Sequence, residues 1–189
     1  MNTKKYLIRG ALTIGILAFG VIVLQWAGGG AISELTQDVS ITRYEDTKAE
    51  PNLGKQAPYF ELSNLRGNRV RLSDFLGTPV IILFWASWNQ SAADQLKIVD
   101  DYYASHKDGA FTIIAINTQE DKSVAASFMK RGGYEVPTIL DSKGAVGETY
   151  HIQNLPTIYF IDRSGIVRGI FVGVMNQSQL VDNSEKIIK

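Results

Sequence analysis

A long uncharged run lies near the start of the chain, and short apolar segments recur further along it. No charged residue interrupts residues 10–32, and Lys4, Lys5 and Arg9 precede this run. A membrane-spanning helix needs about 20 mostly apolar residues, so the run predicts a single transmembrane anchor. Positively charged flanks stay on the cytoplasmic side of a membrane. We therefore expect residues 1–9 in the cytoplasm and the remainder of the chain on the other side of the membrane.

A cleaved secretory signal is the alternative interpretation of the same run. Such signals have a shorter apolar region, of about 7 to 15 residues, followed by small residues at the cleavage site. Residues 29–31, Gly-Gly-Ala, could serve as that site. The length of the run favours an uncleaved anchor, and a helix of a soluble core is disfavoured because no polar face interrupts the run. Residues 33–52 are polar and aperiodic, which predicts a linker.

From residue 53 onward, short apolar runs alternate with segments of helical periodicity. The continuous apolar run over 79–85 is typical of a strand buried on both faces, and residues 111–116 predict a second buried strand. Helical patterns follow over 91–106 and from Asp121 or Ser123 to the glycine pair at 132–133. The other predicted elements are strands at 59–62, 69–72, 156–161 and 166–172, a helical turn at 73–77, a short helical segment ending at Tyr150, and a final helix capped by Asn176 or Ser178 and ending at Ile188. This alternation, closed by a hairpin, predicts one α/β domain over 53–189 with a central mixed sheet flanked by helices.

Charge and cysteine content exclude several functions. The 19 basic and 19 acidic residues cancel, so no basic excess points to a nucleic-acid partner. The absence of cysteine excludes disulfides, thiolate metal sites, cysteine nucleophiles and a lipid-modified cysteine anchor. The chain contains two histidines, His106 and His151, and no phosphate-binding glycine loop. We therefore expect neither a metal site nor a cofactor.

Four segments in a fixed order carry a resemblance to a known family. They are residues 54–62 (GKQAPYFEL), 67–77 (GNRVRLSDFLG), 80–88 (VIILFWASW) and 155–165 (LPTIYFIDRSG). Together they resemble the thioredoxin superfamily, and most closely the membrane-tethered extracytoplasmic reductases of the TlpA/ResA type with the related redoxin branch. The resemblance covers roughly residues 53–173 and implies a thioredoxin-like fold.

The chain departs from this family at the positions that carry its chemistry. The family has Cys-x-x-Cys after the second tryptophan, whereas this chain has Asn89-Gln90-Ser91-Ala92. Asn89 stands at the attacking cysteine and Ala92 at the resolving one, so neither a thiolate nor an exchange step is available. Gln95 stands where the group commonly carries a proton-handling glutamate. The resemblance therefore implies a degenerate active site with no catalytic residue, and we expect no independent enzymatic turnover.

The positions that remain indicate recognition of a polypeptide. The resemblance implies a cis bond before Pro156, in a loop that pairs its backbone with an extended substrate polypeptide without using a thiol. Trp88 is expected to be exposed beside the same groove, where an aromatic side chain can contact a partner. The expected binding surface comprises Trp88, Asn89, Gln90, Ser91, Leu155 and Pro156.

The interpretation is a membrane-anchored, extracytoplasmic, non-catalytic domain that binds another envelope polypeptide. Three alternatives stay open. The protein could be a thiol-disulfide oxidoreductase that works only with thiols supplied by a partner. It could be a purely structural domain whose useful surface lies elsewhere. Finally, Pro156 could merely shape the entry to a strand.

Overall fold

A computed structural model describes residues 51–107 and 109–188 of the chain. The anchor predicted for residues 10–32 lies outside these ranges, as does the linker up to residue 50. Within the described ranges, no helix is both long and apolar enough to cross a bilayer.

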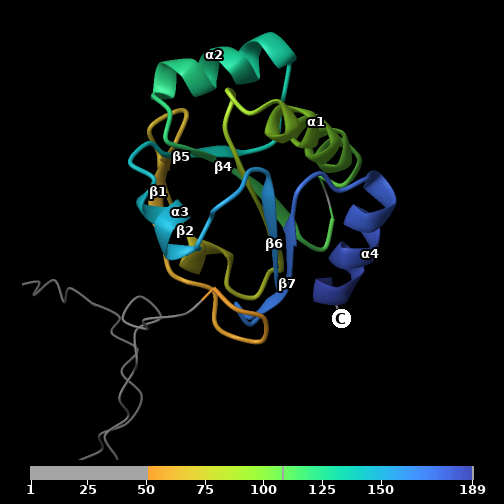
Figure 1. Ribbon diagram of the computed structural model, residues 1–189. Helices are drawn as coiled ribbons and strands as arrows, with labels where there is room; N and C mark the ends of the chain where they lie inside the picture. The colour runs from red at the N-terminus through yellow and green to blue at the C-terminus, as the bar shows by residue number, and fades with distance from the viewer. Residues whose placement is uncertain (1–50, 108, 189) are drawn as a thin grey trace, which may run out of the picture. The chain divides into compact units, whose positions relative to one another are not determined.

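One seven-stranded mixed sheet forms the centre of the domain (Figure 1), in the order β2-β1-β5-β4-β3-β6-β7. The strands are β1 (Glu61–Asn64), β2 (Arg69–Arg71), β3 (Val80–Trp85), β4 (Thr112–Thr118), β5 (Thr138–Asp141), β6 (Thr157–Ile161) and β7 (Val167–Val172). The central strands β3, β4 and β5 run parallel, and antiparallel pairs complete the sheet on both sides. The predicted mixed sheet and both hairpins are confirmed.

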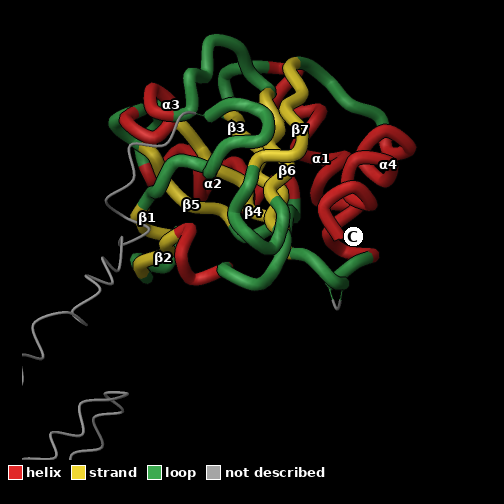
Figure 2. Tube along the Cα trace, turned by 90° about the horizontal axis from the view of Figure 1, so that it is seen from below, coloured by secondary structure: helices red, strands yellow, loops and turns green. Residues whose placement is uncertain are grey.

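Helices cover both faces of this sheet because its central strands are apolar on both sides. The helices are α1 (Gln90–Ser105), α2 (Lys122–Gly132), α3 (Ala145–Thr149) and α4 (Gln177–Ile188). Leu83 and Trp85 pack on one face with apolar residues of α1, α2 and α4. Phe84 and Ile116 pack on the other face with Tyr150, which ends α3. Figure 2 shows α4 alongside α1 and the β6–β7 hairpin.

The helix boundaries follow local signals that the sequence displays. Gly133 ends α2 in the left-handed conformation, with φ of 68°, and its N–H donates to the carbonyl of Lys130. Asn176 rather than Ser178 caps α4, because its Oδ1 accepts the N–H of Gln179 at 2.9 Å. Both signals depend only on neighbouring residues, so the sequence predicts the end of α2 and narrows the cap of α4 to Asn176 or Ser178.

Strand β5 is the element that the residue pattern does not reveal. Its four residues are too few to show a period, and Asp141 looks like the start of a turn. The strand exists because β4 pairs with it in parallel on one side and β1 pairs with it antiparallel on the other. Tertiary pairing therefore decides the conformation of this segment.

Candidate functional site

The turn after β3 leads directly into helix α1, and Asn89 caps that helix. Asn89 is extended, and its Oδ1 accepts the backbone N–H of Ala92 at 3.0 Å. The first N–H groups of a helix lack partners within the helix, and a capping side chain supplies one of them. The two positions that the family resemblance aligns with cysteines are thus joined by a capping hydrogen bond.

The side chains of this turn divide between the core and the surface. Trp85 is fully buried and packs against Phe128, with 5.4 Å between ring centroids. Trp88 is 63% exposed, and Gln90 and Ser91 are exposed as well. The predicted exposure of Trp88 is confirmed, and the turn presents an aromatic side chain to solvent.

The loop before β6 contains the predicted cis bond between Leu155 and Pro156. The carbonyl of Pro156 accepts the N–H of Gly173, which follows β7, at 2.9 Å. Among residues 51–107 and 109–188, no hydrogen bond involves the backbone N–H or C=O of Leu155. The backbone of Leu155 is therefore free to pair with another chain.

The turn and this loop line a common recess of about 340 Å³. Its lining includes the carboxamides of Asn89, Gln119, Gln153 and Asn154 together with Trp88 and Leu155. Glu148 is the one ionisable side chain that lines it in the described structure. The structure thus brings together three of the predicted residues, Trp88, Asn89 and Leu155, whereas Gln90, Ser91 and Pro156 do not line the recess.

Gln119 is a recess residue that sequence reasoning missed. It has a positive φ of 58°, which is uncommon for a residue with a side chain. Its N–H donates to the carbonyl of Asp141 at 3.0 Å, and a Cβ at Gly144 would lie 2.9 Å from its Nε2. Residues held in such conformations cluster at ligand sites. No local sequence signal marks the position, because the conformation depends on β5 and the loop after it.

A buried carboxylate behind the turn was also missed. Glu120 accepts hydrogen bonds from the N–H of Ser87 at 2.8 Å, the hydroxyl of Ser87 at 2.5 Å and Nδ2 of Asn117 at 2.6 Å. These bonds tie the segment after β4 to the turn that holds Trp88. In the sequence, Glu120 looks like an ordinary charge before a helix. Its contact with a residue 33 positions away is visible only in the fold.

The third substituted position, Gln95, forms a structural contact. Its side chain is fully buried, and its Oε1 accepts the N–H of Met175 at 2.5 Å. Its Nε2 has no hydrogen-bond partner in the described structure. The three substitutions therefore have separate roles: Asn89 caps α1, Ala92 is buried in the core, and Gln95 joins α1 to the segment after β7. In the part of the chain that the structure describes, no three His, Asp or Glu side chains gather as they would around a metal ion.

Comparisons with known proteins identify the family and the fold of the chain. The AhpC/TSA family model matches residues 53–170. Thiol-disulfide oxidoreductase ResA of Geobacillus kaustophilus (strain HTA426) is 30% identical over 146 residues, which cover 77% of this chain and 84% of that protein. ResA of Bacillus subtilis (strain 168) is 32% identical over 129 residues, covering 68% and 72%.

Solved structures of other proteins have the same fold. A DsbE-like thiol:disulfide interchange protein from Chlorobium tepidum matches with a TM-score of 0.67 and 28% identity, over 73% of this chain and 99% of that one. StoA from Bacillus subtilis matches in fold with a TM-score of 0.60 and 24% identity, over 67% of this chain and 96% of that one. The chain, which contains no cysteine, belongs to the AhpC/TSA family and is related to the ResA-type thiol-disulfide oxidoreductases.

Proposed function

We propose that this protein is a membrane-anchored, extracytoplasmic domain that binds an extended polypeptide segment without catalysing thiol exchange. The observation that carries the proposal is the recess between the α1 turn and the Leu155 loop. Exposed Trp88 and the unpaired backbone of Leu155 both border this recess. A polypeptide can gain backbone hydrogen bonds from such a loop and apolar contact from such a tryptophan.

An exposed apolar rim beside the recess supports a polypeptide ligand. Val172 and Val174 are 58% and 47% exposed, and Gly173 between them is hydrogen-bonded to Pro156. Both valines therefore lie next to the Leu155 loop. Val172 is the last residue of β7, an edge strand of the sheet, and Val174 lies two residues beyond it. Exposed apolar side chains at a free sheet edge are typical of a surface that takes an added strand.

The charge of the recess restricts the bound segment. Glu148 contributes a negative charge, and no lysine or arginine lines the recess in the described structure. The carboxamides around it can donate to and accept from a peptide backbone. This lining favours a neutral or basic segment and disfavours an acidic one.

The non-catalytic part of the proposal rests on the lack of an activated nucleophile at the turn. No thiolate can form, because the chain contains no cysteine. The Ser91 hydroxyl has no hydrogen bond to a histidine or a carboxylate in the described structure, so no neighbouring base activates it. In an insulin-reduction assay the full-length chain should give no rate above buffer, with a two-cysteine reductase as positive control. Clear turnover would refute this part of the proposal.

Photo-crosslinking tests the binding part. A photoreactive amino acid at position 90, next to the recess, should capture a discrete polypeptide in intact cells. The same group at position 185, an exposed position near the end of α4, is the matched control and should not capture it. Capture from position 185 alone would refute binding at the recess and favour a surface elsewhere.

The absence of cysteine also makes the proposed membrane topology simple to test. A single cysteine introduced by Thr3→Cys or by Thr47→Cys is the sole thiol of that variant. A maleimide that does not cross membranes should label the Thr47→Cys variant in intact cells and leave the Thr3→Cys variant unlabelled until the cells are lysed. The opposite pattern, or equal labelling, would overturn the topology.

A further inference from the structure

A second recess, of about 470 Å³, lies at the opposite end of the central strands. The first recess borders Thr118 and Gln119, where β4 ends. The second borders Thr112 and Ile114, where β4 begins. Seven residues of extended strand separate the two regions by roughly 20 Å. The second recess is thus a separate feature, and the proposed polypeptide site does not use it.

The recess exists because β5 is shorter than its neighbour β4. Pairing between the two strands begins with Ala115 opposite Thr138, and the N–H of Ala115 donates to the carbonyl of Pro137 at 2.8 Å. The N–H of Thr112 donates to the carbonyl of Pro79, before β3. Successive residues of a strand direct their backbone polar groups to opposite sides, so those of Ile113 face the side of β5, where no strand residue lies opposite them. Pro137 has no N–H to offer there, and in the described structure no backbone hydrogen bond joins Ile113 to residues 134–137.

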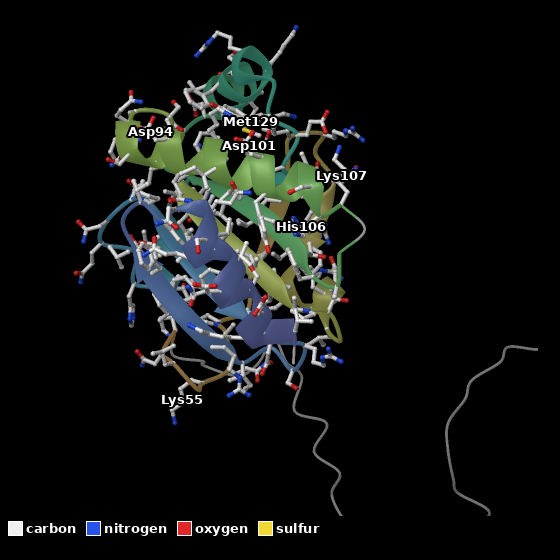
Figure 3. The ribbon with its side chains drawn as sticks, turned by 90° about the vertical axis from the view of Figure 1, so that its right-hand side faces the viewer. Lys55, Asp94, Asp101, His106, Lys107 and Met129 are labelled. Atoms are coloured by element: carbon white, nitrogen blue, oxygen red, sulfur yellow. The ribbon has the colours of Figure 1, made fainter. Side chains whose placement is uncertain are left out.

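Apolar and aromatic residues predominate in the lining of the recess. Met129, Val136 and Ile139 are buried lining residues, and Tyr103 and Tyr134, which also line it, are half-buried. Figure 3 shows Met129 between α2 and α1. Sites for small molecules are concave, mostly apolar cavities of about 300–1,000 Å³ with a few polar groups. The second recess meets this description better than the first, whose lining includes four carboxamides and a carboxylate.

The mouth of the recess carries an uncompensated positive charge. Arg66, in the turn between β1 and β2, lines the recess and is exposed. Its guanidinium makes no hydrogen bond or ion pair with any residue of the described structure. Glu135 is the one acid in the described lining, and Lys107 already neutralises it. The hydrogen bond from Lys107 keeps the pKa of the Glu135 carboxyl below its usual value, so this pair stays charged and matched.

We propose that the second recess binds a small amphipathic carboxylate. Its apolar body would lie among Tyr103, Met129 and Tyr134, and its carboxylate would pair with Arg66. An ammonium head group would be repelled by Arg66, and the one acid of the described lining, Glu135, is already paired with Lys107. A neutral head group would leave the charge of Arg66 unpaired.

Methionine methyl groups provide a direct measurement in the full-length chain. The chain has three methionines. Met129 lines the second recess, Met175 is fully buried beside Gln95, and Met1 is the first residue. We would label all three methyl groups with ¹³C, reconstitute the full-length chain in lipid nanodiscs without free detergent, and titrate it with octanoate. The Met129 signal should shift and saturate, while the Met175 signal stays in place.

Two comparisons make the result specific. Octanol, which has the same apolar body without charge, should bind about three- to fivefold more weakly, as expected for loss of one exposed ion pair. Arg66→Gln should weaken octanoate binding by the same factor and leave octanol binding unchanged. Lys55→Gln, which removes an exposed cation far from Met129 (Figure 3), is the matched control and should change neither. The proposal is overturned if Met129 does not shift, if Met175 shifts in proportion, or if octanol binds as tightly as octanoate.

Discussion

Replacing Asn89 by alanine should destabilise the domain, because the hydrogen bond from the Ala92 N–H to Asn89 caps α1. Loss of a capping side chain costs about 0.5–2 kcal/mol of the free energy of unfolding. Ala92 is fully buried, so water does not readily replace the lost acceptor of its N–H. We therefore expect a cost of about 1–2 kcal/mol, in the upper part of that range.

Asn89→Asp is the matched control for this prediction. The carboxylate keeps an acceptor for the Ala92 N–H, and its negative charge at the start of α1 contributes about 0.3–1 kcal/mol through the helix dipole. The Asp variant should therefore be at least as stable as the natural chain. The ranking expected from the structure is Asp, then Asn, then Ala.

Urea unfolding of the full-length chain, followed by far-ultraviolet circular dichroism, measures the difference. Tryptophan fluorescence is unsuitable because Trp88 adjoins the mutated residue. For a chain of this size, 1 kcal/mol corresponds to about 2–4 °C in Tm, which gives an independent check. The reasoning fails if Asn89→Ala unfolds at the same urea concentration as the natural chain, or if Asn89→Asp is as unstable as Asn89→Ala. In either case Asn89 would have no capping role.

Three further predictions, two on buried polar contacts and one on a surface turn, are each measured by urea unfolding of the full-length chain. Glu120→Leu should cost about 3 kcal/mol because three donors lose their acceptor, whereas Glu120→Gln should cost less than about 1 kcal/mol; equal costs would contradict the network. Gln95→Met should cost about 1–3 kcal/mol because the buried N–H of Met175 loses its acceptor, and no cost would show that this bond is not stabilising. Burial alone would raise the pKa of Asp162, but hydrogen bonds from backbone N–H groups and from Arg168 outweigh it and hold that pKa below its usual 3.8. The stability advantage over Asp162→Asn should therefore be complete at pH 7 and decline as the pH falls below 3.8, and an advantage that grows in acid would contradict this assignment.

Much of the fold is predictable from the sequence because its signals are local. The apolar runs that become β3 and β4 and the glycine that ends α2 require no knowledge of distant residues. Strand β5 is different, because four residues without a period become a strand only between two partners. The gap that forms the second recess is a consequence of how short β5 is. The residue pattern therefore does not predict that recess.

Some residues of the candidate site are likewise predictable from the sequence and others are not. Trp88 and the Leu155 loop were predicted from the family resemblance, and the structure places both at one recess. Glu120 and Gln119 were not predicted, because one depends on a contact with Ser87 and the other on a backbone conformation set by the loop after β5. Gln95 was identified as a degenerate position, but its bond to Met175 spans 80 residues and is visible only in the fold.

The yield of crosslinking from position 90 in a Trp88→Ala variant tests the central claim most directly. Trp88 is the most exposed apolar side chain at the recess, and Val124, an exposed apolar residue of α2, gives the matched control Val124→Ala. If the former active-site turn is now a polypeptide-binding site, Trp88→Ala should lower the yield of the captured partner several-fold and Val124→Ala should not change it. An unchanged yield in Trp88→Ala, or an equal loss in both variants, would contradict the claim.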